Sequence, residues 1–265
     1  MNAMLPRERI SKALRAAAAR GEPALVAFLT AGYPQKQKFR EHLAAVAAGA
    51  DVVEIGVPFT DPMADGVTIQ RSSREALAQG VSLAWIFAEL QAMPRPAAPL
   101  LLMSYLNPLL AHGYARLAAD AVASGVSGFI VPDLPLDESA EMKSALGAHG
   151  LALVQMVTPV TPPERLARLC AASEGFVYAV TMTGTTGKSV AVPADVIDYL
   201  ERVRKLSPVP VCAGFGIRER AQVERLRGHV DGVVVGSALV EVLERGESPQ
   251  VFLAALRPAG RPAGR

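Results

Sequence analysis

The sequence predicts one α/β domain over residues 1–265, in which eight parallel strands close into a (β/α)8 barrel preceded by an extra N-terminal helix. Eight short apolar runs alternate with segments of helical composition along the chain. The runs are apolar at nearly every position, which is typical of parallel strands covered on both faces. Eight such units in about 250 residues match the size of a closed barrel, and no linker-like stretch divides the chain.

Proline and glycine mark the first elements. Pro6 suits the first turn of a helix over residues 7–20, and Gly21 and Pro23 end that helix. The first strand then follows at residues 24–30. The remaining strands are expected in the first half of residues 51–66 and at residues 99–105, 126–131, 151–157, 175–180, 209–213 and 230–235.

Helices are expected after each strand. They lie at residues 36–48, 68–79, 82–93, 114–124, 138–149, 163–172, 195–206 and 220–227, with a closing helix after Ser237. Residues 257–265 are rich in arginine, proline and glycine, so we expect a frayed tail there. The alternative fold is an open, doubly wound sheet. It normally has fewer strands and a glycine-rich turn after the first one, which this sequence lacks.

Composition excludes several classes of protein. Hydrophobic residues make up 51% of the chain and charged residues 20%, which is sufficient for a large core. The net charge is only +2 and no basic stripe carries interleaved aromatic residues, so nucleic-acid binding has no support. Cys170 and Cys212 show no metal-ligand spacing and suit a reducing compartment. No apolar run has the roughly 20 residues of a membrane span, and the N-terminus lacks a signal-peptide core. We expect a cytoplasmic protein.

The second strand and its following loop carry the main chemical signal. Glu54 interrupts an apolar run, and a carboxylate there is either desolvated or faces a cavity. Gly56, Pro58 and Gly66 prevent regular structure in the loop that follows, which carries Asp65. Carboxylates at and beyond the end of a strand are typical of an α/β active site. The alternative is a structural glutamate paired with an arginine, with the loop aspartates as turn or N-cap residues.

A closed parallel barrel brings the carboxyl ends of all its strands to one rim. Residues near these ends are therefore expected to converge without being close in sequence. The candidates are Phe28, Glu54, Asp65, Tyr105, Asn107, Asp133, Tyr178, Gly214, Gly216, Gly236 and Ser237.

Three consecutive units have glycine-rich loops, at residues 184–187, 214–216 and 236–237. Each exposes backbone N–H groups, and the last one opens a helix whose positive end favours an anion. The loops predict a phosphate site, although tight turns alone would also need the glycines. Neither nucleotide motif is complete: Met182 stands where a Walker A loop needs glycine, and Glu219 stands where a dinucleotide fingerprint needs its third glycine.

Histidine chemistry has no support, because each histidine falls in or beside a helix or at the opposite rim. These residues are His42, His112, His149 and His229. A serine triad would lack its base. Acid–base chemistry is therefore expected from carboxylates and tyrosine.

With these residues in hand, the sequence resembles the tryptophan synthase alpha chain family over nearly its whole length. The run from Glu54 to Gly66, followed by residues 68–70, carries the resemblance most specifically. Further matches lie at residues 28–34, 103–108, 131–135, 184–187, 214–217 and 236–238.

The resemblance implies aldol cleavage of indole-3-glycerol phosphate to indole and glyceraldehyde 3-phosphate. Glu54 would protonate the indole ring at C3, and Asp65 would stabilise the resulting cation through N1–H. The resemblance further implies a set of ligand contacts. They are Phe28, Tyr105, Tyr178 and Thr186 for the substrate, and Gly187, Gly216, Gly236 and Ser237 for its phosphate. No metal and no cofactor are implied in this chain.

The resemblance also implies a partner, a β chain that holds pyridoxal phosphate, in an α2β2 tetramer. Its contacts would be Pro58, Asp61, Asn107 and Asp133. The motifs leave two alternatives open: a stand-alone lyase of the same fold, and a barrel that binds a phosphorylated sugar without catalysis. Met182 and Tyr33 depart from residues seen in some family members, and neither belongs to the carboxylate pair.

Overall fold

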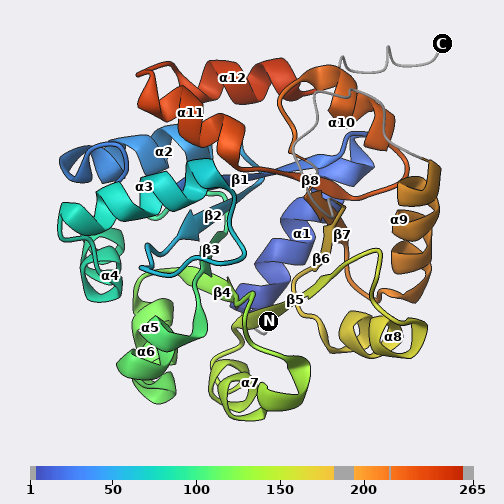
Figure 1. Cartoon of the computed structure of the whole chain (residues 1–265), viewed down its shortest axis with the longest axis horizontal. Coiled ribbons are helices and arrows are strands. Elements are labelled where there is room, and N and C mark those ends of the chain that lie inside the picture. The colour runs from blue at the N-terminus through green and yellow to red at the C-terminus, as the bar shows by residue number, and fades with distance from the viewer. Residues whose placement is uncertain (1–3, 182–193, 215, 259–265) are drawn as a thin grey trace.

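The computed structural model describes residues 4–181, 194–214 and 216–258, and within them the strands form a closed parallel barrel (Figure 1). Each strand pairs with its neighbours in the chain, and β1 pairs with β8 to close the ring. The strands are β1 Ala24–Thr30, β2 Val52–Gly56, β3 Leu100–Met103, β4 Val126–Ile130, β5 Ala152–Val157, β6 Val177–Val180, β7 Val211–Gly214 and β8 Gly232–Val235.

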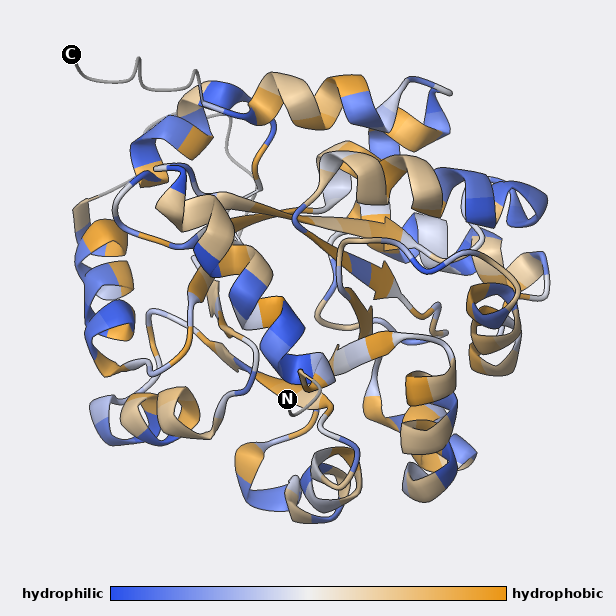
Figure 2. Cartoon of the chain, turned by 180° about the vertical axis from the view of Figure 1, so that it is seen from behind, coloured by the Kyte–Doolittle hydropathy of each residue, from blue (hydrophilic) through white to orange (hydrophobic). Residues whose placement is uncertain are grey.

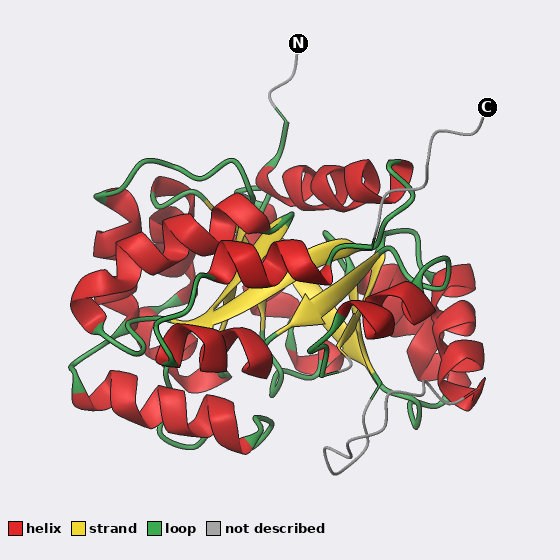
Figure 3. Cartoon of the chain, turned by 90° about the horizontal axis from the view of Figure 1, so that it is seen from above, coloured by secondary structure: helices red, strands yellow, loops and turns green. Residues whose placement is uncertain are grey.

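Helices surround the strands on the outside, as the view in Figure 3 shows. The α-helices are α1 Pro6–Ala19, α2 Phe39–Gly49, α3 Val67–Ala78, α4 Leu83–Gln91, α5 Leu106–His112, α6 Tyr114–Ala123, α7 Ala140–Gly147, α8 Pro163–Ala172, α9 Ala194–Leu206, α10 Arg220–Leu226, α11 Ser237–Glu244 and α12 Pro249–Leu256. Two 3-10 turns, η1 Lys36–Lys38 and η2 Leu136–Glu138, precede α2 and α7. The barrel fold predicted from the sequence is therefore confirmed.

The extra N-terminal helix closes one end of the barrel. Ile10, Leu14 and Ala17 of α1 are fully buried and belong to the same apolar cluster as Val26 and Val52, whose side chains face the barrel interior. Seen from behind in Figure 2, α1 lies across this end of the strands. A larger cluster lies between the strands and the outer helices. Apolar side chains therefore fill the barrel interior from the amino ends of the strands toward their carboxyl ends.

Several details differ from the sequence expectation. Residues 106–112, which include the expected loop at Asn107, form the short helix α5. The expected helix over residues 36–48 begins as the turn η1, and the single closing helix is two helices, α11 and α12. At the C-terminus, Arg257 donates to Gly49 O at 3.0 Å and to Asp51 Oδ2 at 3.1 Å. Residues 259–265 of the expected frayed tail lie outside the described part.

Strand register positions the residues of the rim. Phe28 of β1 pairs with Glu54 of β2, and Tyr178 of β6 pairs with Cys212 of β7. Two glycines make room for these rings. A Cβ at Gly56 would lie 2.5 Å from Phe28 Cζ, and one at Gly214 would lie 2.8 Å from Tyr178 Cε1, so neither position accepts a side chain without a shift of the ring.

Candidate active site

Glu54 is a buried carboxyl group inside the barrel, near its carboxyl end. It lies two residues beyond Val52 in β2, and residues two apart in a strand face the same side, so it points inward above the packed interior. Its side chain is 1% exposed, and Oε2 has no hydrogen-bond partner among the described residues. Burial raises the pKa of Glu54 to about 8, and the charge of Asp65 adds to the rise. Among the residues that the structure describes, no ion pair of this glutamate is observed, in contrast to the alternative interpretation.

Asp65 lies in the loop after β2 and is held by Tyr105, which follows β3. The Tyr105 hydroxyl donates to Asp65 Oδ2 at 3.2 Å and accepts the Ala64 N–H at 2.9 Å. The Phe59 ring stacks on the Tyr105 ring with centroids 5.1 Å apart, which fixes the tyrosine from the same loop. Burial raises the pKa of Asp65 to about 6, while the Tyr105 bond favours its ionised form.

Tyr178 faces the two carboxyl groups from the opposite wall of the barrel. Burial raises its pKa well above the ordinary value, and the negative charges of Glu54 and Asp65 contribute to the rise. Cys212, its partner in β7, is also fully buried with a raised pKa. Tyr178 is therefore a neutral hydroxyl group at neutral pH, able to donate a hydrogen bond.

The two carboxyl groups differ in charge at neutral pH. With a pKa of about 8, Glu54 is largely protonated, and with a pKa of about 6, Asp65 is largely ionised. When the environments of two nearby carboxyl groups give them different pKa values in this way, one can act as an acid and the other can stabilise positive charge. The pair therefore suits a reaction that needs a proton donor and a fixed anion around one small ring.

The loops after β7 and β8 form the side of the rim expected to bind phosphate. Gly216 has φ of 63°, a conformation that favours glycine. Gly236 directly precedes α11, which begins at Ser237, and the first N–H groups of a helix have no partner inside it. A Cβ at Gly236 would lie 3.9 Å from Phe28 Cβ, so this helix start adjoins the Glu54 wall. Thr186 and Gly187, expected at the substrate and its phosphate, lie outside the described residues.

The residues expected to contact a partner lie at this same rim, on loops except for Asn107, which is the second residue of α5. Asp61, Asn107 and Asp133 are exposed, whereas Pro58 is buried against its own chain. Asp133 also has a local role that the sequence did not indicate: Oδ1 accepts the N–H of Leu106 at 2.9 Å, at the first residue of α5. Met63 and Val67, which flank Asp65 in sequence, expose 83% and 81% of their surface.

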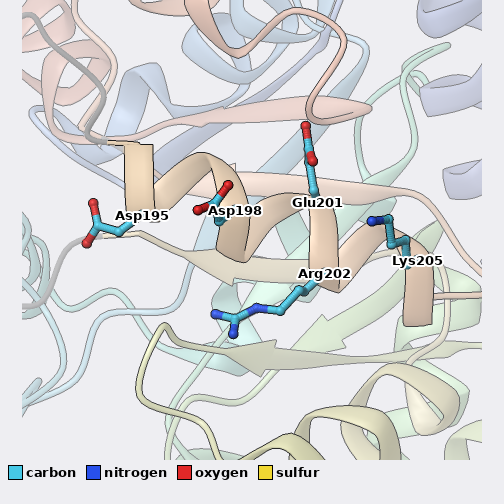
Figure 4. A pocket seen from close by; sticks show the side chains of 5 residues that line it. All are labelled: Asp195, Asp198, Glu201, Arg202 and Lys205. Atoms are coloured by element: carbon cyan, nitrogen blue, oxygen red, sulfur yellow. The ribbon is translucent and has the colours of Figure 1, made fainter.

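Two surface hollows lie away from the carboxyl pair. One, of about 380 Å³, runs along α9 and is lined only by charged side chains (Figure 4). Its residues are Asp195, Asp198, Glu201, Arg202 and Lys205. Asp198 and Glu201 each precede a base, Arg202 and Lys205, by four residues, which is typical of a solvated helix face. The other, of about 450 Å³, is an apolar groove between α8 and α9. Within the described ranges, no cluster of His, Cys, Asp and Glu has the arrangement of a metal site.

The sequence reasoning missed several contacts of the site. Phe59 was not expected to stack on Tyr105, and the bridge of Thr68, Arg218 and Glu241 near the phosphate loops was not foreseen. Arg218 and Glu241 are 23 residues apart in sequence, so their opposite charges were the only signal in the sequence that could have indicated this pair.

Comparison with known proteins places this geometry in a family. A sequence model of the family "Tryptophan synthase alpha chain" matches residues 14–258. The tryptophan synthase alpha chain of Nitratidesulfovibrio vulgaris is 44% identical over 249 residues, covering 93% of this chain and 97% of the relative. That of Solidesulfovibrio magneticus is 45% identical over 251 residues, covering 94% and 96%.

Solved structures agree with the sequence comparison. A chain in the structure of Mycobacterium tuberculosis tryptophan synthase superposes with a TM-score of 0.86 at 35% identity, covering 94% of this chain and 96% of that one. Tryptophan synthase subunit alpha from Legionella pneumophila gives 0.84 at 29% identity, covering 96% and 97%. None of the helices in the described ranges has the length and apolar character to span a membrane. The chain belongs to the tryptophan synthase alpha chain family, which catalyses the alpha reaction of tryptophan biosynthesis.

Proposed function

We propose that this chain is a carbon–carbon lyase that cleaves indole-3-glycerol phosphate into indole and glyceraldehyde 3-phosphate. The observation that carries the proposal is the pair of carboxyl groups at the barrel mouth: Glu54 is buried with Oε2 unpartnered in the described part of the chain, and Asp65 is held by the Tyr105 hydroxyl group. Cleavage at C3 of an indole ring needs both, because the ring leaves readily only after C3 has been protonated.

Glu54 is the proton donor and then the base in this reaction. Its protonated carboxyl group transfers a proton to C3, which leaves the ring as a cation. The Glu54 carboxylate then accepts the proton of the hydroxyl group on the side-chain carbon attached to C3. That carbon becomes the aldehyde carbon of glyceraldehyde 3-phosphate, the bond to C3 breaks, and its electron pair returns to the ring to give indole.

Asp65 stabilises the cationic intermediate. Its carboxylate accepts the N1–H of the ring, and this bond strengthens as positive charge spreads toward N1. Tyr105 holds the carboxylate through the bond to Oδ2 and thereby fixes the direction in which Asp65 faces the ring. Phe28 and Tyr178, from opposite walls, pack against the indole ring.

The phosphate group binds at the loops after β6, β7 and β8. Gly216 supplies a backbone N–H group from the loop after β7. Gly236 and Ser237 supply theirs at the start of α11, where the helix dipole favours the anion. Gly187 completes the phosphate contacts and Thr186 the substrate contacts. Binding energy from the phosphate orients the indole ring between the two carboxyl groups.

The chain acts with a β chain that carries pyridoxal phosphate, in an α2β2 tetramer, while the α chain itself uses no cofactor. The rim supports such a contact. Met63 and Val67 expose large apolar surfaces beside Asp65, and Asp61, Asn107 and Asp133 are exposed nearby, two on loops and Asn107 in α5. A partner seated there would touch the loop that carries Asp65. Addition of β chain is therefore expected to raise the rate of indole formation, and an unchanged rate would favour the stand-alone lyase.

The decisive experiment is incubation of the purified chain with indole-3-glycerol phosphate and measurement of released indole and glyceraldehyde 3-phosphate. Equal amounts of the two products are expected, and omission of the enzyme is the control. Tight binding of the substrate without release of indole would overturn the proposal and support the non-catalytic binding barrel.

A further inference from the structure

Glu241 ties together two of the loops that surround the proposed phosphate site. It lies one turn beyond Ser237 in α11, so both residues occupy the same face of that helix. Its carboxylate accepts two bonds from Arg218, at 2.7 Å from Nη1 to Oε2 and 2.9 Å from Nη2 to Oε1. Arg218 lies two residues beyond Gly216 in the loop after β7. The pair therefore fixes the β7 loop against the helix that follows β8.

The same carboxylate also contacts the helix behind the catalytic loop. Thr68 Oγ1 donates to Glu241 Oε1 at 3.4 Å, and Thr68 is the second residue of α3, three residues after Asp65. Gln70, two residues further along α3, donates from Nε2 to the Asp65 carbonyl oxygen at 2.8 Å. Polar contacts thus join the β7 loop through Glu241 to the start of α3, and α3 itself holds Asp65 through Gln70.

The electrostatic environment keeps this bridge charged. Arg218 lowers the pKa of Glu241 below its ordinary value, and the side chain of Glu241 is 25% exposed. An exposed ion pair by itself contributes only about 0–1 kcal/mol to stability. The two-point geometry fixes the direction of the guanidinium group as well as its distance. The bridge is therefore better suited to placing loops than to stabilising the fold.

We propose that Glu241 is a positioning residue that couples the phosphate-binding loops to Asp65: it holds the β7 loop through Arg218 and α3 through Thr68. This inference rests on the proposed function, since it assigns a phosphate-bearing substrate to the loops. Occupation of the phosphate site would then order the loop that carries Asp65 before the ring is protonated, and loss of the bridge would separate the two events.

A positioning role and a purely electrostatic role of Glu241 predict opposite changes in phosphate affinity when its charge is removed. Removing a negative charge near an anion site tightens anion binding if only the charge matters. If Glu241 positions the β7 loop, Glu241→Gln instead weakens the binding of inorganic phosphate, by about five- to tenfold. The matched control is Glu247→Gln. Glu247 accepts two bonds from Arg245, at 2.6 and 2.8 Å, and these bonds connect neither the β7 loop nor α3. Binding to this control should equal or slightly exceed that of the wild type.

The second arm of the bridge is tested separately with Thr68→Val, which keeps the side-chain shape and removes the hydroxyl group. We expect phosphate affinity within about twofold of the wild type and a kcat for indole release that is several-fold lower. This variant also serves if Glu241→Gln does not fold. Calorimetry with inorganic phosphate on the full chain measures the first quantity, and the indole assay measures the second.

The outcomes separate the bridge from the reaction. Phosphate binding that is unchanged or tighter in Glu241→Gln overturns the positioning role, and so does an unchanged kcat in Thr68→Val. If the wild type binds phosphate but releases no indole, the proposed reaction is wrong. The positioning of the β7 loop is then still decided by the comparison of Glu241→Gln with Glu247→Gln.

Discussion

The two ends of the barrel differ in how their acidic side chains are paired. At the amino ends of the strands, Asp51 Oδ2 accepts the N–H of Leu25 at 2.9 Å, and Asp231 Oδ2 accepts the N–H of Val211 at 2.8 Å. Arg20 donates to the other oxygen of Asp51 at 3.0 Å. At the mouth, Glu54 Oε2 has no partner within the described ranges.

The difference shows where the molecule is stabilised and where it is prepared to react. Carboxylates with all their bonds made join neighbouring strands and helices, and they keep the barrel closed. A buried carboxyl group without partners is unfavourable for folding, and it retains a proton that a substrate can take. Each end can be altered separately, and the four predictions below do so in order of decreasing effect.

Glu54→Gln is expected to give the largest effect on activity. The amide keeps the shape of the carboxyl group but neither donates a proton to carbon nor takes one back. We expect kcat for indole release to fall by about 10²–10⁴-fold, the range typical of a lost general acid–base group. Steady-state kinetics measures this change, and near wild-type turnover would disprove the role of Glu54.

The pH dependence of the free energy of unfolding gives an independent test of the same variant. The folded pKa of Glu54, about 8, lies above its ordinary value of 4.5, so the folded state binds more protons between these pH values. The wild type should therefore lose stability as pH rises from about 4.5 to about 8. Denaturant unfolding across that range should show a flatter dependence in Glu54→Gln, with the fold intact throughout.

Asp65→Asn is expected to reduce kcat by about 10²-fold, because a neutral amide no longer stabilises the positive charge of the ring. The effect should be smaller than for Glu54→Gln, since proton transfer to C3 is still available. Inhibition by indole analogues that lack N1–H provides a second measurement. The loss of N1–H should weaken binding to the wild type and leave binding to the variant nearly unchanged.

Asp51→Ala tests the other end of the barrel. It leaves the Leu25 N–H without its acceptor and removes a partner of Arg20 and Arg257. We expect the free energy of unfolding to fall by about 1–3 kcal/mol, the cost of an unsatisfied buried group. The values of kcat and KM measured well below the unfolding temperature should match the wild type. A large loss of activity in a folded variant would contradict the separation of the two ends.

Tyr105→Phe is expected to give the smallest effect, on the pH profile. Asp65 acts as an anion, so activity falls as pH drops through its pKa, about 6, and it falls again above the pKa of Glu54, about 8. Without the Tyr105 hydrogen bond the pKa of Asp65 rises, so the acidic limb of kcat/KM should move to higher pH by about one unit or less. The basic limb should stay in place.

Much of the fold followed from local chemistry. The strand β1 and the helix α8 have the expected bounds because apolar runs there are bordered by proline and glycine. The helix α5 was missed because Asn107 and Pro108 are typical of loops. Pro108 is the third residue of that helix, where a backbone N–H has no intrahelical acceptor, so proline is tolerated there.

The candidate site was predictable in its carboxyl groups and not in their supports. Glu54 was evident because a charged residue interrupts a buried strand. The bond from Tyr105 to Asp65 joins residues 40 positions apart, and the one from Thr68 to Glu241 joins residues 173 apart. Such contacts depend on the relative placement of whole strands and helices, which no local pattern in the sequence encodes.

The seal that α1 makes across the barrel has a consequence for molecular traffic. Within the described residues, Ile10 and Leu14 fill that end of the interior, so a ligand reaches Glu54 from the carboxyl ends of the strands. Products then leave from the same end of the barrel, so an outgoing product and an incoming substrate compete for one passage. A molecule bound over that end would therefore control both substrate entry and product release.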